Sequence, residues 1–170
     1  MTAMVAMPAV ASAPALLKGA GNFRSLSLVN ERTGEWLNTV YWVEGEYIPD
    51  ALVAVNYIMR DWREDQVHRI DPRTLDIMSA TQKLLDCSEP FQVVSGYRTA
   101  KTNALLRRRS KAVAAKSYHI KGMAADIAMK TRSVRQISLA GLSLDAGGVG
   151  KYSRSQFVHL DSGPVRDWGR

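Results

Sequence analysis

Short strand and helix signals alternate along this chain without the regular strand–helix–strand repeat of a parallel sheet, and this pattern constrains the fold most. In residues 24–43, Leu26 and Leu28 alternate with serines before a Glu-Arg-Thr-Gly-Glu turn and a second apolar run, which predicts a β-hairpin. A Gly147-Gly148 turn is expected before the last strand. The other expected elements are helices from Pro49, from Pro72 and over 99–109 and 133–144, and short strands over 91–95, 123–129 and 156–161. We therefore predict an α+β fold in which helices flank a small, mainly antiparallel sheet.

The composition is that of one folded domain. With 170 residues, of which 46% are hydrophobic and 23% charged, the chain is large and apolar enough to bury a core. No apolar run reaches the ~18 residues of a membrane-spanning helix, so we expect no transmembrane segment. The formal net charge of +7 favours an anionic partner, whether nucleic acid, a membrane surface or a cell-wall polymer.

The N-terminal segment differs in composition from the rest of the chain. Residues 1–17 carry no charged side chain, and Ala11-Ser12-Ala13 fits the cleavage pattern of a secretory signal, although the basic region that normally precedes such a segment is missing. We expect residues 1–20 to be a signal-like or disordered segment and residues 21–170 to form the domain. Export is the favoured interpretation.

The cysteine and histidine content limits the possible metal sites. The single cysteine, Cys87, excludes an internal disulfide and a multi-cysteine zinc site. Any metal site must combine carboxylates with His68, His119 or His159. His68 precedes a helix cap without ligand-like neighbours, so we leave it out of the site.

A histidine and an aspartate stand seven residues apart around a glycine in the segment 117–126. Gly122 permits a tight turn, so His119 before it and Asp126 on the following strand can meet. Alanines flank Asp126, and a lone charge in such an apolar strand would cost several kcal/mol. A hydrogen-bonded Asp–His pair, a salt bridge or a metal ion can compensate that charge.

The strand expected over 156–161 supplies a second histidine. Its period of two puts His159 and Asp161 on one face. Together, His119, Asp126 and His159 offer three ligands that zinc accepts and leave a fourth position for water, as catalytic zinc sites do. Water bound in that position becomes a nucleophile near neutral pH.

Arg98 ends the segment Ser-Gly-Tyr-Arg after the strand expected over 91–95. Its guanidinium can hold a substrate carboxylate through two parallel hydrogen bonds. The alternative is a surface arginine that follows a turn.

Four ordered motifs resemble one family of enzymes. They are S-G-Y-R (95–98), S-x-H-x-x-G-x-A-x-D (117–126), G-G-V-G-x-Y (147–152) and F-V-H-x-D-x-G-P-V-R (157–166). In this combination the chain resembles the murein endopeptidase K type of zinc peptidase over about residues 21–168. That family belongs to the D-alanyl-D-alanine peptidase clan, so the resemblance implies the fold that the clan shares with the hedgehog signalling domain and the lysostaphin-type enzymes.

The resemblance also implies chemistry. It implies Zn²⁺ bound by His119, Asp126 and His159, with Ser117 and Arg98 near the substrate. It implies a zinc metallopeptidase that acts on peptidoglycan stem peptides, as an endopeptidase on their cross-links in preference to a carboxypeptidase. It further implies an exported protein that is periplasmic or associated with the cell wall. The twin-arginine signal that is frequent in the family is absent from this sequence.

The resemblance leaves the general base unassigned. Relatives in the clan often carry an acidic residue three positions before the last histidine ligand, where this chain has Gln156, and others carry a histidine where it has Phe157. Asp161 is our candidate, either as the catalytic base or as a carboxylate that holds His159 in its metal-binding tautomer. Arg98 is the second residue expected to act in catalysis, by orienting the substrate.

Two other functions are considered. A metal-stabilised module that binds the cell wall without turnover would be compatible with Gln156. A nucleic-acid-binding domain would use the basic run 107–109, but such a run at a helix end is usually a solvated face. Because no nucleic-acid fold signature accompanies it, we expect no nucleic-acid partner.

Overall fold

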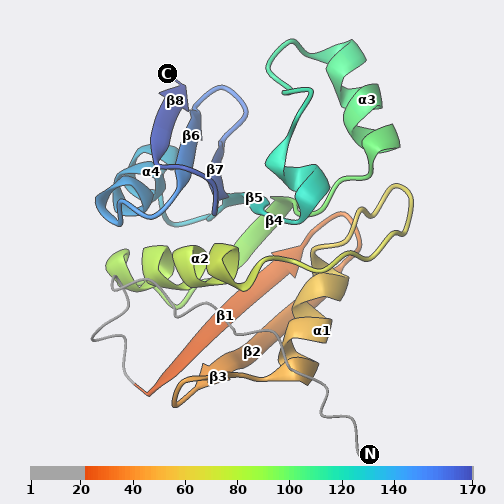
Figure 1. Cartoon of the computed structure of the whole chain (residues 1–170). Coiled ribbons are helices and arrows are strands. Elements are labelled where there is room, and N and C mark those ends of the chain that lie inside the picture. Colours follow the sequence, from red (N-terminus) through yellow and green to blue (C-terminus); the bar gives the residue numbers. More distant parts are fainter. Residues whose placement is uncertain (1–21, 170) are drawn as a thin grey trace, which may run out of the picture.

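The computed structural model describes residues 22–169 of the chain (Figure 1). One mixed sheet of eight strands runs through it in the order β3-β2-β1-β4-β5-β7-β6-β8. The strands are β1 (Phe23–Asn30), β2 (Glu35–Val43), β3 (Glu46–Tyr47), β4 (Phe91–Ser95), β5 (Ala124–Ala128), β6 (Gly148–Tyr152), β7 (Phe157–Asp161) and β8 (Arg166–Gly169). The predicted signal-like segment 1–20 and its boundary with the domain lie outside the described residues.

Antiparallel pairs dominate the sheet. Only β1 with β4 and β6 with β8 pair in parallel, whereas the other neighbouring strands are antiparallel. The helices are α1 (Pro49–Ile58), α2 (Pro72–Leu84), α3 (Ala100–Arg109), α4 (Val134–Ser143) and the short 3₁₀ helix η2 (Tyr118–Lys121). The prediction of an α+β fold with a mainly antiparallel sheet is confirmed. Among the described helices, none has the length and apolar character needed to cross a membrane.

Side-chain caps fix where three of the helices begin. Asp71 accepts a hydrogen bond from the backbone N–H of Arg73 at the start of α2, where Pro72 takes the first helical position. Thr99 caps α3 in the same way, and Ser133 forms a capping box at the start of α4. These caps set the helix starts that the sequence predicted.

The alternation of side chains along the strands decides which face of the sheet is buried. Leu26 and Leu28 of β1 are completely buried, as are Ile127 of β5 and Leu160 of β7. Helix α1 packs against β1 and β2, α2 against β1 and β7, and α4 against β6 and β7, so these helices cover the apolar face. The opposite face of β5 and β7 carries Asp126, His159 and Asp161.

The segment 147–152 differs from the sequence expectation. A turn was expected at Gly147-Gly148. Gly147 does lie in a bend, but Gly148 begins β6, and β8 follows β7, so β7 is not the last strand. A Cβ at Gly150 would lie 2.6 Å from the Trp168 indole, and one at Gly148 would lie 2.4 Å from Nη1 of Arg166. Gly148 and Gly150 are therefore needed because side chains of β8, and at Gly148 also the Asp161 carboxylate of β7, occupy the space above β6.

Candidate metal centre

Neighbouring strands and a short helix bring three side chains together. Asp126 of β5 and His159 of β7 are direct register partners in the antiparallel ladder. His119 reaches them from η2, which ends at Gly122 in the left-handed conformation, with φ of 67°. A Cβ at Gly122 would lie 2.2 Å from the backbone oxygen of Arg69, so only glycine fits this turn. The expected role of Gly122 in bringing His119 to Asp126 follows from this geometry.

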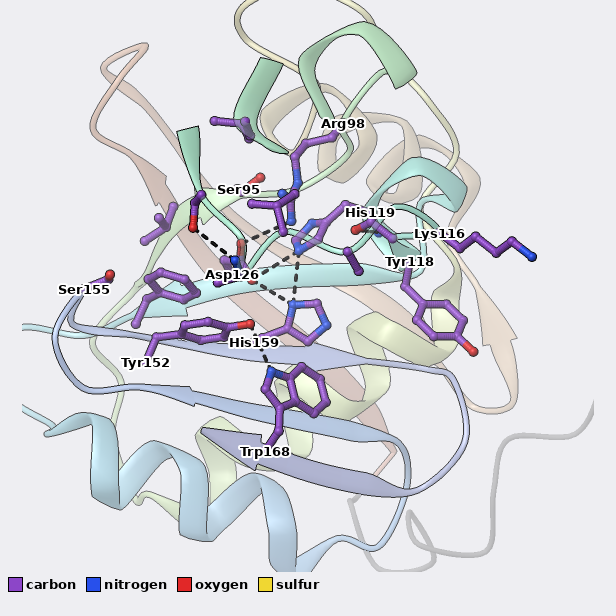
Figure 2. Close-up of a pocket in the computed structure, with 18 of the residues that line it drawn as sticks. Ser95, Arg98, Lys116, Tyr118, His119, Asp126, Tyr152, Ser155, His159 and Trp168 are labelled. Atoms are coloured by element: carbon purple, nitrogen blue, oxygen red, sulfur yellow. Dashed lines mark hydrogen bonds and ion pairs between the residues drawn. The ribbon is translucent and has the colours of Figure 1, made fainter. Parts of the chain in front are cut away.

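The predicted convergence of His119, Asp126 and His159 is observed (Figure 2). Oδ1 of Asp126 lies 3.1 Å from Nε2 of His119 and 2.8 Å from Nδ1 of His159, and the two nitrogens lie 3.1 Å apart. A tetrahedral ion with bonds of about 2.0–2.1 Å would hold its ligand atoms roughly 3.3 Å apart. The three atoms therefore have the spacing of ligands around one small cation.

Two further hydrogen bonds fix the imidazole tautomers. Nδ1 of His119 lies 2.6 Å from the carbonyl oxygen of Gly96, which can only accept, so this nitrogen carries the proton. Nε2 of His159 lies 2.9 Å from Oδ2 of Asp161, which leaves Nδ1 of His159 facing the cluster. Two nitrogen lone pairs and a carboxylate oxygen thus point at one place. They repel one another unless a cation lies between them, so this group can bind a metal ion.

The charge states of Asp126 and His119 suit a metal ion, whereas a metal ion must displace a proton from His159. Burial raises the pKa of Asp126, but the two imidazoles outweigh burial and hold that pKa far below its usual range. Burial lowers the pKa of His119 and favours its neutral form. Burial also opposes the charge on His159, but hydrogen bonds to Asp126 and Asp161 prevail and raise the pKa of His159. An ionised carboxylate and a neutral imidazole are the forms that ligate metals.

Asp161 lies behind His159, on the strand face that the sequence predicted. It is completely buried, and its two oxygens accept hydrogen bonds from Nη1 and Nη2 of Arg166 at 3.0 and 2.7 Å. The backbone N–H of Gly163 donates a further bond at 2.8 Å. Burial raises the pKa of Asp161, but the bonds from His159 and Arg166 prevail and hold it well below its usual range.

The cluster forms part of the wall of a cleft of about 610 Å³. Helix α3 and the loop after it rise on one side of this cleft (Figure 1), and side chains of β6, β7 and β8 line the other. Of the described residues that line it, Asp126 is the only acid, whereas four are cationic: Arg63, Arg98, Lys116 and Arg166. The cleft is therefore electropositive and suits an anionic ligand.

Arg98 is not the surface arginine of the alternative interpretation. It is 7% exposed, lines the cleft, and places Nη2 3.5 Å from Oδ2 of Asp126. Its buried Nε has no hydrogen-bond partner within residues 22–169. Ser117, also in the cleft wall, caps η2 by accepting a hydrogen bond from the backbone N–H of His119. Both residues that were expected near the substrate thus lie beside the cluster.

Comparison with known proteins places the chain in a family of peptidases. The family model described as peptidoglycan L,D-endopeptidase MepK matches residues 18–168. The chain belongs to this family. It is 43% identical over 145 residues to the peptidoglycan L,D-endopeptidase MepK of Escherichia coli strain K12, which covers 85% of this chain and 80% of that protein. The same identity and coverage hold for the Shigella flexneri protein of that name. The probable peptidoglycan L,D-endopeptidase MepK of Haemophilus influenzae is 40% identical over 146 residues.

Membership in this family confirms the resemblance found in the sequence motifs. It also makes the chain a member of a group of metallopeptidases, which the His-Asp-His cluster supports independently. The match covers all four motifs, so the buried cluster, Arg98 and Arg166 all lie inside the matched region.

Sequence reasoning missed several residues that shape the site. The Gly96 carbonyl orients His119, Arg166 holds Asp161, and Trp168 packs beside His159 with its ring centroid 5.2 Å away. Gly96 and Arg166 lie inside the quoted motifs, but the contact of Gly96 with His119 joins residues 23 apart in the chain, and the contact of Arg166 with Asp161 depends on the turn between β7 and β8. Gln156 lies in the exposed turn before β7 and is not among the described residues that line the cleft.

Proposed function

We propose that this protein is a zinc-dependent peptidoglycan L,D-endopeptidase that hydrolyses stem-peptide cross-links of the bacterial cell wall. The observation that carries the proposal is the buried group of His119, Asp126 and His159 beside an electropositive cleft, in a chain of the MepK family. Stem peptides are rich in carboxylates, so an anionic substrate matches the charge of the cleft.

Zinc is the metal that this donor set favours. Two imidazole nitrogens and one carboxylate oxygen form a three-ligand set of the kind found in catalytic zinc sites, with one position left for water. Bound there, zinc lowers the pKa of its water to about 7 and polarises a carbonyl group. The protein's own contribution is to keep both imidazoles in the metal-binding tautomer, through the Gly96 carbonyl and Asp161.

Of the two roles considered for Asp161, positioning of His159 is the better supported. Both of its oxygens already accept hydrogen bonds from Arg166, and the carboxylate is completely buried behind His159. It does not line the cleft in which a substrate would lie. A base must reach the proton that it removes, and Asp161 has no such access.

Arg98 is proposed to bind a substrate carboxylate, and Ser117 to contact the substrate beside it. The free Nε of Arg98 and its Nη groups offer the fork that a carboxylate accepts. Because Arg98 also lies next to Asp126, a carboxylate bound there would hold the scissile bond near the cluster. Action on the cell wall requires export, so we propose a periplasmic or wall-associated protein whose residues 1–20 belong to the export signal.

Digestion of purified sacculi with defined cross-links, followed by mass spectrometry of the fragments, tests this function. We expect fragments cut at L,D-cross-links, loss of cleavage with a chelator, and recovery with Zn²⁺. His159→Ala should be inactive, whereas the matched control His68→Ala, which changes a histidine outside the cluster, should retain activity. Cleavage that survives zinc removal would contradict the proposal.

The alternative of a wall-binding module without turnover has one observation in its favour. Apart from Asp126, no described residue of the cleft wall carries a carboxylate that could serve as a general base. The same experiment decides between them, because a binding module would sediment with sacculi and release no fragments.

A further inference from the structure

The hydroxyl of Tyr152 is held beside the metal centre by a tryptophan that the sequence did not single out. Trp168 lies over Gly150, where a Cβ would come within 2.6 Å of its indole, and its ring centroid is 5.2 Å from that of His159. From this position Nε1 of Trp168 donates a hydrogen bond to the Tyr152 hydroxyl at 2.9 Å. Figure 2 shows that hydroxyl pointing toward the cluster.

The strand register places the ring of Tyr152 on the metal-binding face. In the ladder between β6 and β7, Gly150 is opposite His159 and Tyr152 is opposite Phe157. Partners in a ladder share a face, so Tyr152, Phe157 and His159 project from the same side of the sheet. The Tyr152 ring stacks on Phe157 with centroids 4.5 Å apart, which fixes it from a second direction.

The hydrogen-bond inventory determines where the phenolic proton can point. An indole N–H can only donate, so in its bond with Trp168 the Tyr152 oxygen is the acceptor and its own proton must point elsewhere. Within residues 22–169, no side chain or carbonyl accepts that proton. Tyr152 lines the cleft together with Arg98 and the cluster, so its free donor faces the space that a substrate would fill.

We propose that Tyr152 donates a hydrogen bond to the oxygen of the scissile carbonyl while negative charge develops on it. This inference rests on the proposed peptidase function. In the step, the oxygen of water bonds to the carbonyl carbon, and the π electron pair of the C=O bond moves onto the carbonyl oxygen. Tyr152 stabilises the negative charge on the carbonyl oxygen and keeps its own proton. When the C–N bond breaks, that pair returns to the carbonyl and the amine leaves with a proton that came from the attacking water. Donors arranged in advance at such an oxygen are among the largest contributors to catalysis.

Arg98 is less suited to this task than Tyr152. Its Nη2 lies 3.5 Å from the Asp126 carboxylate, and the proposed function assigns its remaining donors to a substrate carboxylate. Nor is Tyr152 placed to act as a base, because the Trp168 N–H already occupies its accepting side.

Tyr152→Phe tests the inference, since it keeps the ring on Phe157 and removes only the hydroxyl. Three quantities would be measured for the wild type and the variant: the rate of cleavage of a soluble cross-linked muropeptide, the zinc content of the protein, and the affinity for a phosphinate that imitates the charged tetrahedral state. We expect kcat to fall about 10²-fold or more, as for loss of one oxyanion donor. KM should stay within about twofold and zinc content should not change, whereas phosphinate affinity should fall by a factor similar to that of kcat.

Two further variants sharpen the test. Trp168→Phe should lower kcat in the wild-type background but add nothing in the Tyr152→Phe background, because it acts through the orientation of the hydroxyl. Tyr57→Phe removes a hydroxyl from an exposed tyrosine outside the cleft wall and should behave as wild type.

Three results would overturn the role of Tyr152: a kcat of Tyr152→Phe within about threefold of wild type, a loss of zinc that accounts for the loss of activity, or unchanged phosphinate affinity. An inactive wild-type protein would instead contradict the peptidase function itself.

Discussion

Replacing Asp161 with asparagine tests how the His159 imidazole is held in place. Oδ2 of Asp161 faces His159 and one Arg166 nitrogen, and Oδ1 faces the other Arg166 nitrogen and the N–H groups of Gly163 and Gly148. Asparagine has the same shape, but its NH₂ group can only donate. In either orientation of the amide, the asparagine NH₂ group therefore faces N–H groups that donate to Asp161 in the wild type.

The cost follows from those contacts. In the better orientation the NH₂ group replaces Oδ2, so the bonds from His159 and one Arg166 nitrogen are lost. The N–H of His159 is left buried without a partner, which costs about 1–3 kcal/mol, whereas the partly exposed Arg166 nitrogen can turn to water, so the free energy of unfolding of the zinc-free protein should fall by about 1–3 kcal/mol. Zinc affinity should fall about 10–100-fold, as when other groups that orient metal-bound histidines are changed.

Urea unfolding of the zinc-free protein measures the first quantity, and zinc titration against a chromophoric chelator measures the second. Asp167→Asn removes an exposed carboxylate of β8 and serves as the matched control, for which we expect neither change. If Asp161→Asn bound zinc within about twofold of wild type and unfolded at the same urea concentration, the idea that Asp161 positions His159 would be refuted.

Three further changes probe the site and the fold. Gly122→Ala should destabilise the protein more than Gly34→Ala in urea unfolding. Both glycines have positive φ, but only at Gly122 would the new Cβ meet another backbone atom, the Arg69 oxygen at 2.2 Å. Equal losses of unfolding free energy in the two variants would contradict this close approach. Arg98→Lys should lower kcat/KM about tenfold or more for a substrate with a free carboxylate, because lysine lacks the two parallel hydrogen bonds of the guanidinium. For the corresponding amide substrate the loss should be much smaller. Equal losses of kcat/KM for the two substrates would exclude carboxylate binding by Arg98. Burial raises the pKa of Glu89, but hydrogen bonds from the loop after β5 prevail and lower it. Its stabilising effect is therefore present above the unfolded pKa of about 4.3 and is lost as the pH falls through the lower folded value. The difference in unfolding free energy between wild type and Glu89→Gln should accordingly shrink in acid, and a difference that grows there would contradict the assignment.

Local sequence patterns predicted the parts of the site that depend on local geometry. The glycine turn between His119 and Asp126 and the strand period that puts Asp161 on the His159 face both depend on a few neighbouring residues. Strand alternation in β1 likewise predicted its buried face. These rules follow from backbone geometry, so one sequence is enough to apply them.

Contacts that cross the sheet could not be predicted in this way. The Gly147-Gly148 pair predicted a turn, because local sequence does not show that Arg166 and Trp168 of a later strand fill the space above Gly148 and Gly150. The burial of Arg98 depends on the elements packed around it, and the bond from Trp168 to Tyr152 depends on the parallel pairing of β6 with β8. Such long-range pairing is specified by the whole fold and not by local propensity.

X-ray absorption spectroscopy at the zinc edge of the purified protein tests the central claim most directly. We predict one zinc per chain in a four-coordinate shell of nitrogen and oxygen at about 2.0–2.1 Å, with two imidazoles and no sulfur. His119→Ala, Asp126→Ala and His159→Ala should each remove or weaken this signal. A sulfur ligand, a site that persists in all three variants, or a protein that retains no zinc would contradict the claim that these residues form the metal centre.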